Sequence, residues 1–125
     1  MKKSDVEVFE KLQPQIIGLY DELSVFSKKS PDGAINKFKL KFINQLLCTS
    51  SKILESKYLP FPDFEKFDED TLPTNSDAIF IANQYINCLQ KFKSDNVTYS
   101  GGAWHWILED SKEFIETSRP LGRLI

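Results

Sequence analysis

The chain has 125 residues, a length typical of one domain, and 41% of them are hydrophobic. Together with an aromatic share of 13% and a charged share of 27%, this excludes an intrinsically disordered chain. The net charge of -2 disfavours a globally basic nucleic-acid-binding protein, although not a local basic patch. No stretch approaches the roughly 18 consecutive apolar residues of a membrane-spanning helix. We therefore expect one compact domain over residues 1–125, without a membrane segment.

The N-terminal residues and the cysteines favour a cytoplasmic protein. Lys2 and Lys3 are followed by acidic residues instead of the apolar stretch of a signal peptide. Cys48 and Cys88 lie in apolar helical stretches, where a buried, reduced thiol behaves as a small hydrophobic residue. Most of the 16 basic residues are lysines, a skew that suits a bacterial source with an AT-rich genome.

The first predicted helix covers residues 4–26. Ser4 and Glu7 have the S-x-x-E spacing of a capping box, which satisfies backbone donors at a helix start. Apolar residues then recur in alternating steps of three and four, at Phe9, Leu12, Ile16, Leu19, Leu23 and Phe26. Pro14 falls inside this pattern, so the helix either kinks there or ends, with Pro14 opening a second helix.

Two periodicities compete in the second segment, residues 34–58. Lysine and apolar residues alternate over residues 37–42 as in a strand, whereas the wider window keeps helical spacing over about five turns. Length favours the helix, because strands usually stop at four to eight residues. We then expect Phe38 and Phe42 on the apolar stripe and Leu40 as an outlier on the lysine side.

Residues 59–75 are expected to connect two helices, because prolines break regular structure there. Three phenylalanines are spaced through the segment, at Phe61, Phe64 and Phe67. We therefore expect an ordered strap that lies across the surface of the core. Its acidic run, which we expect to be solvated, consists of Asp68, Glu69 and Asp70.

The third predicted helix covers residues 76–92 and carries Asp77 near its positive end. Two adjacent apolar stripes follow, one through Ile79, Ala82, Ile86 and Leu89 and one through Ile81, Tyr85, Cys88 and Phe92. A helix that is apolar over such a wide face is buried on more than one side, so we expect it to be the central helix of a bundle.

Two structures fit the C-terminal segment. Alternation through Trp104, Trp106 and Leu108 predicts a strand, with residues 109–112 turning the chain into a partner over residues 114–117. A fourth helix also fits the spacing. The β-branched and aromatic residues after Asn96 slightly favour the hairpin, in which both tryptophans share one side. The predicted fold class is therefore mainly α, with three principal helices and a C-terminal β-hairpin or fourth helix.

The sequence predicts no catalytic residue, no metal site and no cofactor. His105 is the one histidine, so any Cys–His or Ser–His arrangement must use it. The cysteines lie on apolar stripes, where thiols are inert. The acidic strap lacks the glycine-containing loop of a calcium site, and the chain has no glycine-rich phosphate-binding motif.

Charge is segregated along the chain. Residues 28–57 contain seven lysines and two acidic residues, whereas residues 61–77 contain six acidic residues and one lysine. The candidate electrostatic surface consists of Lys37, Lys39, Lys41, Asp68, Glu69 and Asp70. The acidic strap either folds back over the basic helix, or both are solvated, or together they form a bipolar surface that steers a charged partner.

Aromatic residues cluster near the C-terminus, beside two glycines. The candidate partner-binding residues are Tyr99, Trp104, His105 and Trp106, because exposed tryptophans often anchor interfaces. The alternative is that these rings cap the core.

These observations favour a non-enzymatic bacterial protein that acts by binding another protein, as immunity and antitoxin factors do. The alternative is a nucleic-acid-associated regulator that uses the lysine face of the second helix, although bidentate phosphate and base contacts favour arginine. An enzyme that relies on carboxylates is a third hypothesis.

Overall fold

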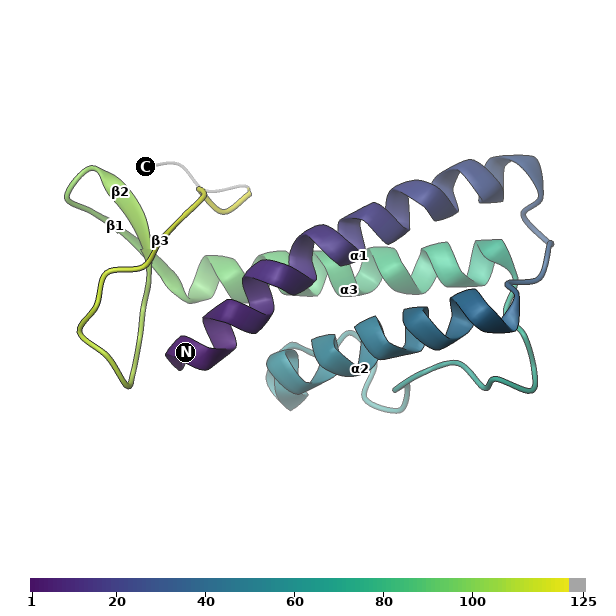
Figure 1. Ribbon diagram of the computed structural model, residues 1–125, viewed down its shortest axis with the longest axis horizontal. Coiled ribbons are helices and arrows are strands. Elements are labelled where there is room, and N and C mark those ends of the chain that lie inside the picture. The colour runs from purple at the N-terminus through teal and green to yellow at the C-terminus, as the bar shows by residue number, and fades with distance from the viewer. Residues whose placement is uncertain (122–125) are drawn as a thin grey trace.

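The computed structural model describes residues 1–121 and begins with three helices: α1 (Lys3–Lys29), α2 (Lys37–Tyr58) and α3 (Asn75–Asp95). A three-stranded antiparallel sheet follows, with β1 (Val97–Ser100) and β3 (Glu116–Thr117) on either side of β2 (Ala103–Trp106). The sheet lies at one end of the helices and the α1–α2 connection at the other (Figure 1). The predicted mainly α fold with three principal helices is confirmed, and the C-terminal segment is a hairpin extended by a third strand. Residues 122–125, which we assigned to the same domain, lie outside the described residues.

Helix α1 runs through Pro14 without a break. The hydrogen bond that proline removes is offset by packing, because Leu12 and Ile16 are buried on either side of it. The helix begins before the predicted capping box. The Asp5 carboxylate accepts a hydrogen bond from the Lys2 N–H, which is the reciprocal bond that we had assigned to Glu7.

Helix α2 buries a different face from the one expected. Leu40 is fully buried, whereas Phe38 and Phe42 are exposed, so the prediction of which face of the helix is buried was wrong. The buried positions keep steps of three and four, through Leu40, Ile43, Leu47, Ser50 and Leu54. Asn44 and Ser50 are also buried on this face, so the sequence does not show it as a continuous apolar stripe.

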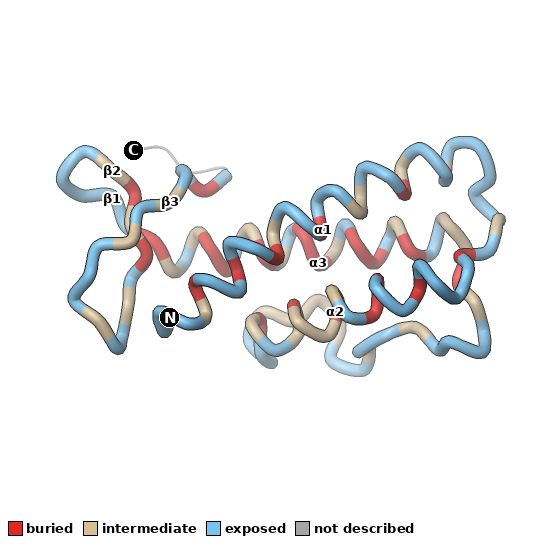
Figure 2. The backbone as a smooth tube through the Cα atoms, in the orientation of Figure 1, coloured by how far each residue is buried: buried red, intermediate tan, exposed pale blue. Residues whose placement is uncertain are grey.

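Helix α3 is the central helix, as predicted, because it packs against both α1 and α2 more extensively than these pack against each other. The Thr74 side chain caps its start by accepting a hydrogen bond from the Asp77 N–H. Buried residues are concentrated along α3 and on the facing sides of α1 and α2, whereas the last turns of α1 are exposed (Figure 2).

The segment between α2 and α3 forms the predicted strap. The buried Asn44 amide donates to the Phe67 carbonyl and accepts from the Phe67 N–H, both at 2.9 Å, so one side chain replaces a strand partner. Phe61 and Phe64 pack partly buried against the core. The strap is therefore fixed by backbone hydrogen bonds and apolar packing.

The sheet covers one end of the bundle. Gly101 and Gly102 form the turn between β1 and β2, both with positive φ, a conformation that glycine adopts without strain. Side chains alternate across β2, so Trp104 and Trp106 point to the same buried side. The Trp106 indole N–H donates to Glu10 of α1 at 2.7 Å, which fixes the sheet on the helix.

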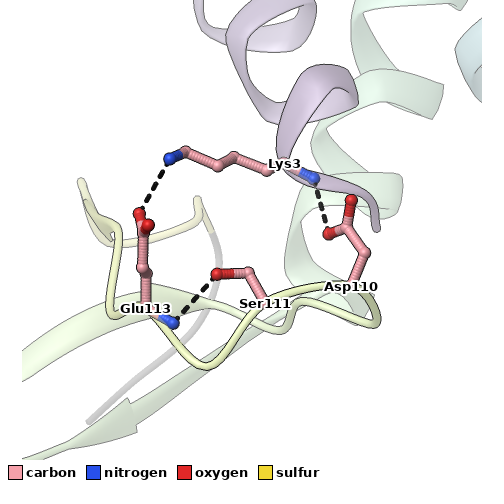
Figure 3. A network of polar contacts seen from close by, with 4 residues as sticks. All are labelled: Lys3, Asp110, Ser111 and Glu113. Atoms are coloured by element: carbon pink, nitrogen blue, oxygen red, sulfur yellow. Dashed lines mark hydrogen bonds and ion pairs between the residues drawn. The ribbon is translucent and has the colours of Figure 1, made fainter.

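The long β2–β3 connection is tied to the start of α1 (Figure 3). The Lys3 N–H donates to the Asp110 carboxylate at 3.0 Å, and the Lys3 ammonium forms an ion pair with Glu113 at 2.9 Å. An acidic side chain at a helix N-terminus also interacts favourably with the helix dipole. The N-terminal turn and the C-terminal segment thus hold each other in place.

Candidate functional site

The structure places the predicted tryptophan anchors inside the protein. Trp106 is 3% exposed and packs edge-on against Phe9, and Trp104 is also buried. We therefore assign both rings to the core, as in the alternative interpretation, because a buried indole offers no surface to a partner. Tyr99 is exposed and contacts the Trp104 ring from outside.

His105 is a structural residue of the sheet. Its Nε2 lies 2.9 Å from the Ser100 carbonyl oxygen, and because a carbonyl only accepts, Nε2 donates this bond. Nδ1 is buried and has no hydrogen-bond partner among the described residues. The Phe114 ring packs against the imidazole. The contacts of His105 are thus with its own sheet and with the β2–β3 connection.

The predicted charged residues are exposed but are not brought together. Lys37, Lys39 and Lys41 are exposed at the start of α2, and Asp68, Glu69 and Asp70 are exposed in the strap. Among residues 1–121, no ion pair joins the two groups. The strap contacts α2 through the Asn44 amide, so hydrogen bonds rather than ion pairs hold it there.

The cysteines and the acidic residues show no metal-binding or redox arrangement within residues 1–121. Cys48 and Cys88 are free and half-buried, which corrects the expectation that both are fully buried. Burial raises the pKa of the Cys88 thiol, so less of the reactive thiolate is present at neutral pH. No group of three potential metal ligands occurs in the described part of the chain.

An apolar groove between α1 and α2 is the feature that our sequence reasoning missed. It has a volume of about 370 Å³ and lies between the C-terminal half of α1 and the N-terminal half of α2. Its apolar walls include Leu19, Leu23, Phe26, Phe38, Phe42 and Leu46. The signal in the sequence was the alternation around Leu40, because one helix cannot bury Phe38, Leu40 and Phe42 on a single face.

Aromatic and cationic groups alternate along the edge of this groove. Phe38 is 74% exposed and meets Phe42 edge-on, with ring centroids 5.1 Å apart. The Lys39 ammonium reaches from α2 to a point 4.4 Å from the centroid of the Phe26 ring on α1. The Lys41 ammonium lies 5.9 Å from the Phe42 ring. Both cations thus have aromatic partners within cation–π range.

The groove continues along the seam between the two helices. A second hollow of about 330 Å³ shares Phe42 and Leu46 with the first. Its other lining residues are Lys11, Gln15, Gln45 and Thr49. The two hollows together follow α1 and α2 for several turns.

Comparisons with known proteins identify no relative: no family model, curated protein or solved structure matches the chain. None of the helices in residues 1–121 combines the length and the hydropathy needed to cross a lipid bilayer.

Proposed function

We propose that the protein acts without catalysis, by binding another protein in the α1–α2 groove. The observation that carries the proposal is the exposure of Phe26, Phe38 and Phe42 along one continuous apolar groove. Apolar surface in water is unfavourable, and contiguous exposed apolar patches typically mark binding sites. The aromatic rings also provide large, rigid contact area, which is the usual composition of interface anchors.

Nucleic-acid binding is the second candidate, and the three exposed lysines at the start of α2 favour it. Single strands bind by stacking their bases on aromatic faces. Here the ammonium groups of Lys39 and Lys41 already lie over the rings of Phe26 and Phe42. A base stacked on either of these rings would have to displace a lysine, and none of the described residues that line the groove is an arginine. Protein binding therefore fits the geometry better.

The setting we propose is the bacterial cytoplasm, where small accessory factors such as immunity or antitoxin proteins act by binding. Two free cysteines suit a reducing compartment.

Affinity capture from the native host with three baits tests the function: the wild-type chain, Phe38→Ser with Phe42→Ser, and Phe114→Ser. Phe114 is 79% exposed at the sheet end and serves as the matched control. We expect the wild type and the Phe114 variant to capture a host protein that the double variant does not capture. Identical capture by all three baits would contradict the groove as the binding site.

The same capture at low salt separates the two candidate functions, because lysine–phosphate contacts are strongest there. Co-purified nucleic acid that disappears with Lys37→Glu and Lys41→Glu, with no groove-dependent protein, would replace our proposal by the second candidate.

A further inference from the structure

We propose that the α1–α2 groove binds one amphipathic helix of a partner protein, with acidic residues beside its apolar stripe. This inference rests on the proposed function and specifies the chemistry of the partner. Three properties of the groove lead to it: its length, the nature of its walls and its charge.

The length of the groove fits a helix of three to four turns. Its two hollows are lined from Lys11 to Phe26 on α1 and from Phe38 to Thr49 on α2. At 1.5 Å per residue these stretches are about 22 Å and about 16 Å long. A helix of about 11–15 residues spans the same distance, whereas a compact small molecule fills only one hollow.

The walls of the groove favour a helix over an extended strand. The two long walls are helices, whose interior backbone N–H and C=O groups bond within the helix itself, and the α1–α2 connection closes one end of the groove. Along the helical walls an extended segment would find few backbone partners, and unpaired buried backbone groups are costly. A helix satisfies its own backbone and offers an apolar stripe that matches the rings of the groove.

The charge of the groove favours acidic flanks on that helix. Among the described residues that line the two hollows, Lys39 lies in the first and Lys11 in the second, and Glu22 is the one acidic side chain. The exposed Lys41 lies 5.9 Å from the Phe42 ring of the groove, and the exposed Lys37 precedes Phe38 in the chain. The acidic strap lies on another face of α2, since it is held by the buried Asn44. Acidic flanks on the partner helix would thus complement the positive excess of the groove.

A second copy of this chain is a less suitable occupant. The acidic, phenylalanine-containing strap of one copy would meet the basic groove of the next, because these are two different surfaces. Such a head-to-tail contact leads to rings or open filaments rather than a simple dimer. Self-association of the chain therefore serves as an outcome of the test.

The test uses two fluorescent synthetic peptides of about 15 residues as probes. Both carry leucines at i, i+3, i+4 and i+7, and they differ only in having glutamate or lysine on the flanks. We expect the acidic peptide to bind the wild type at least tenfold more tightly than the basic peptide at low salt, with a smaller difference at high salt. Phe38→Ser with Phe42→Ser should weaken binding of the acidic peptide at least tenfold, whereas Phe114→Ser should leave its affinity unchanged.

A charge-reversal pair makes the assignment specific. Lys39→Glu with Lys41→Glu should reverse the preference, so that the basic peptide binds more tightly. The matched control, Lys52→Glu with Lys57→Glu, changes the net charge equally on exposed residues at the other end of α2 and should keep the preference for the acidic peptide.

Three results would overturn the inference: equal binding of the two peptides, acidic-peptide binding that survives loss of both phenylalanines, and concentration-dependent self-association that excludes the peptides. Failure with both peptides, together with groove-dependent capture of a host protein, rejects the helical acidic partner but leaves the proposed function standing. Loss of that capture as well rejects both.

Discussion

The two ends of the bundle differ in what covers their aromatic side chains. At the sheet end, Phe9 and Phe92 stack with centroids 5.9 Å apart, and Trp106 closes over them from β2. At the groove end, Phe38 and Phe42 pack on each other, but solvent reaches both rings. Both ends thus carry clustered rings, and within residues 1–121 the chain covers those at the sheet end only.

The domain distributes its apolar surface unevenly between its two ends. The sheet brings residues from the C-terminal quarter of the chain onto the start of α1, where Glu10 accepts from Trp106 and Thr117. At the groove end the short α1–α2 connection pairs with the residues before α3, where the Ile35 N–H donates to the Pro73 carbonyl. No described segment remains to cover Phe38 and Phe42, so a partner would supply there what the sheet supplies at the other end.

Substitution of Trp106 should produce the largest effect on folding. Trp106→Ala removes a ring that packs on Phe9 and leaves the Glu10 carboxylate without its indole donor. Loss of about 3–5 kcal/mol in the free energy of unfolding is expected for truncation of a buried tryptophan. Urea denaturation measures it. An unchanged midpoint would mean that the sheet does not cover the bundle as described.

Detachment of the strap should be the next largest effect. Asn44→Ala leaves the N–H and C=O of Phe67 without their side-chain partner. Unsatisfied buried groups of this kind cost about 1–3 kcal/mol. Denaturation should show this loss, and limited proteolysis should cut residues 59–74 faster than in the wild type. Gln45→Ala, an exposed neighbour on the same helix, should change neither measurement.

The sequence predicted the elements better than the faces they bury. Three helices, the strap and the two-tryptophan strand follow from spacing, caps and prolines, which are local signals. The orientation of α2 did not, because its buried stripe includes Asn44 and Ser50. Asn44 is buried because it bonds to Phe67, 23 positions away, and sequence periodicity contains no information about such a bond.

The candidate site could not be predicted for the same reason. Exposure of Phe38 and Phe42 follows only once Leu40 is known to face the core. Trp104 and Trp106 were candidates for the surface because no local pattern shows that β2 packs on α1. The hydrogen bond that fixes this packing joins Trp106 to Glu10, 96 positions away in the chain. Long-range contacts thus decide which of two aromatic clusters is a core and which is a surface.

A pair of glycine substitutions tests the turn that places the sheet. Gly102 has φ of 85°, which is strained for any residue with a Cβ, so Gly102→Ala should cost about 1 kcal/mol. Gly18 lies inside α1, where no atom would contact an added Cβ, and Gly18→Ala should gain about 0.5–1 kcal/mol. Thermal unfolding should therefore shift in opposite directions. A shift of the same sign would contradict the assigned turn.

The buried Lys93 gives the sheet end a pH dependence. Its ammonium donates to the Ser118 hydroxyl and lies over the Trp106 ring. Burial lowers its pKa below the ordinary 10.5, while nearby Glu10 acts in the opposite direction. Between the lowered value and 10.5 the unfolded chain binds more protons, so this residue adds stability as the pH rises.

Comparison with Lys93→Met isolates that contribution, because every other titratable group is present in both proteins. The unfolding free energy of the methionine variant minus that of the wild type should fall as the pH rises towards 10.5. A difference that stays constant over the alkaline range would show that Lys93 is as well solvated in the folded protein as in the unfolded chain.

The smallest effect on stability is expected at the groove end, and its size shows whether Phe38 is a surface residue or a core residue. Phe38→Ser exchanges a ring that is mostly in water for a residue of similar helix propensity, so the unfolding free energy should change by no more than about 0.5 kcal/mol. A core residue would lose several times more, as Trp106 does. If Phe38→Ser destabilises the fold by more than about 2 kcal/mol, Phe38 belongs to the core and the groove is closed in solution. If stability is unchanged while binding of the acidic peptide is lost, Phe38 contributes to binding and not to folding.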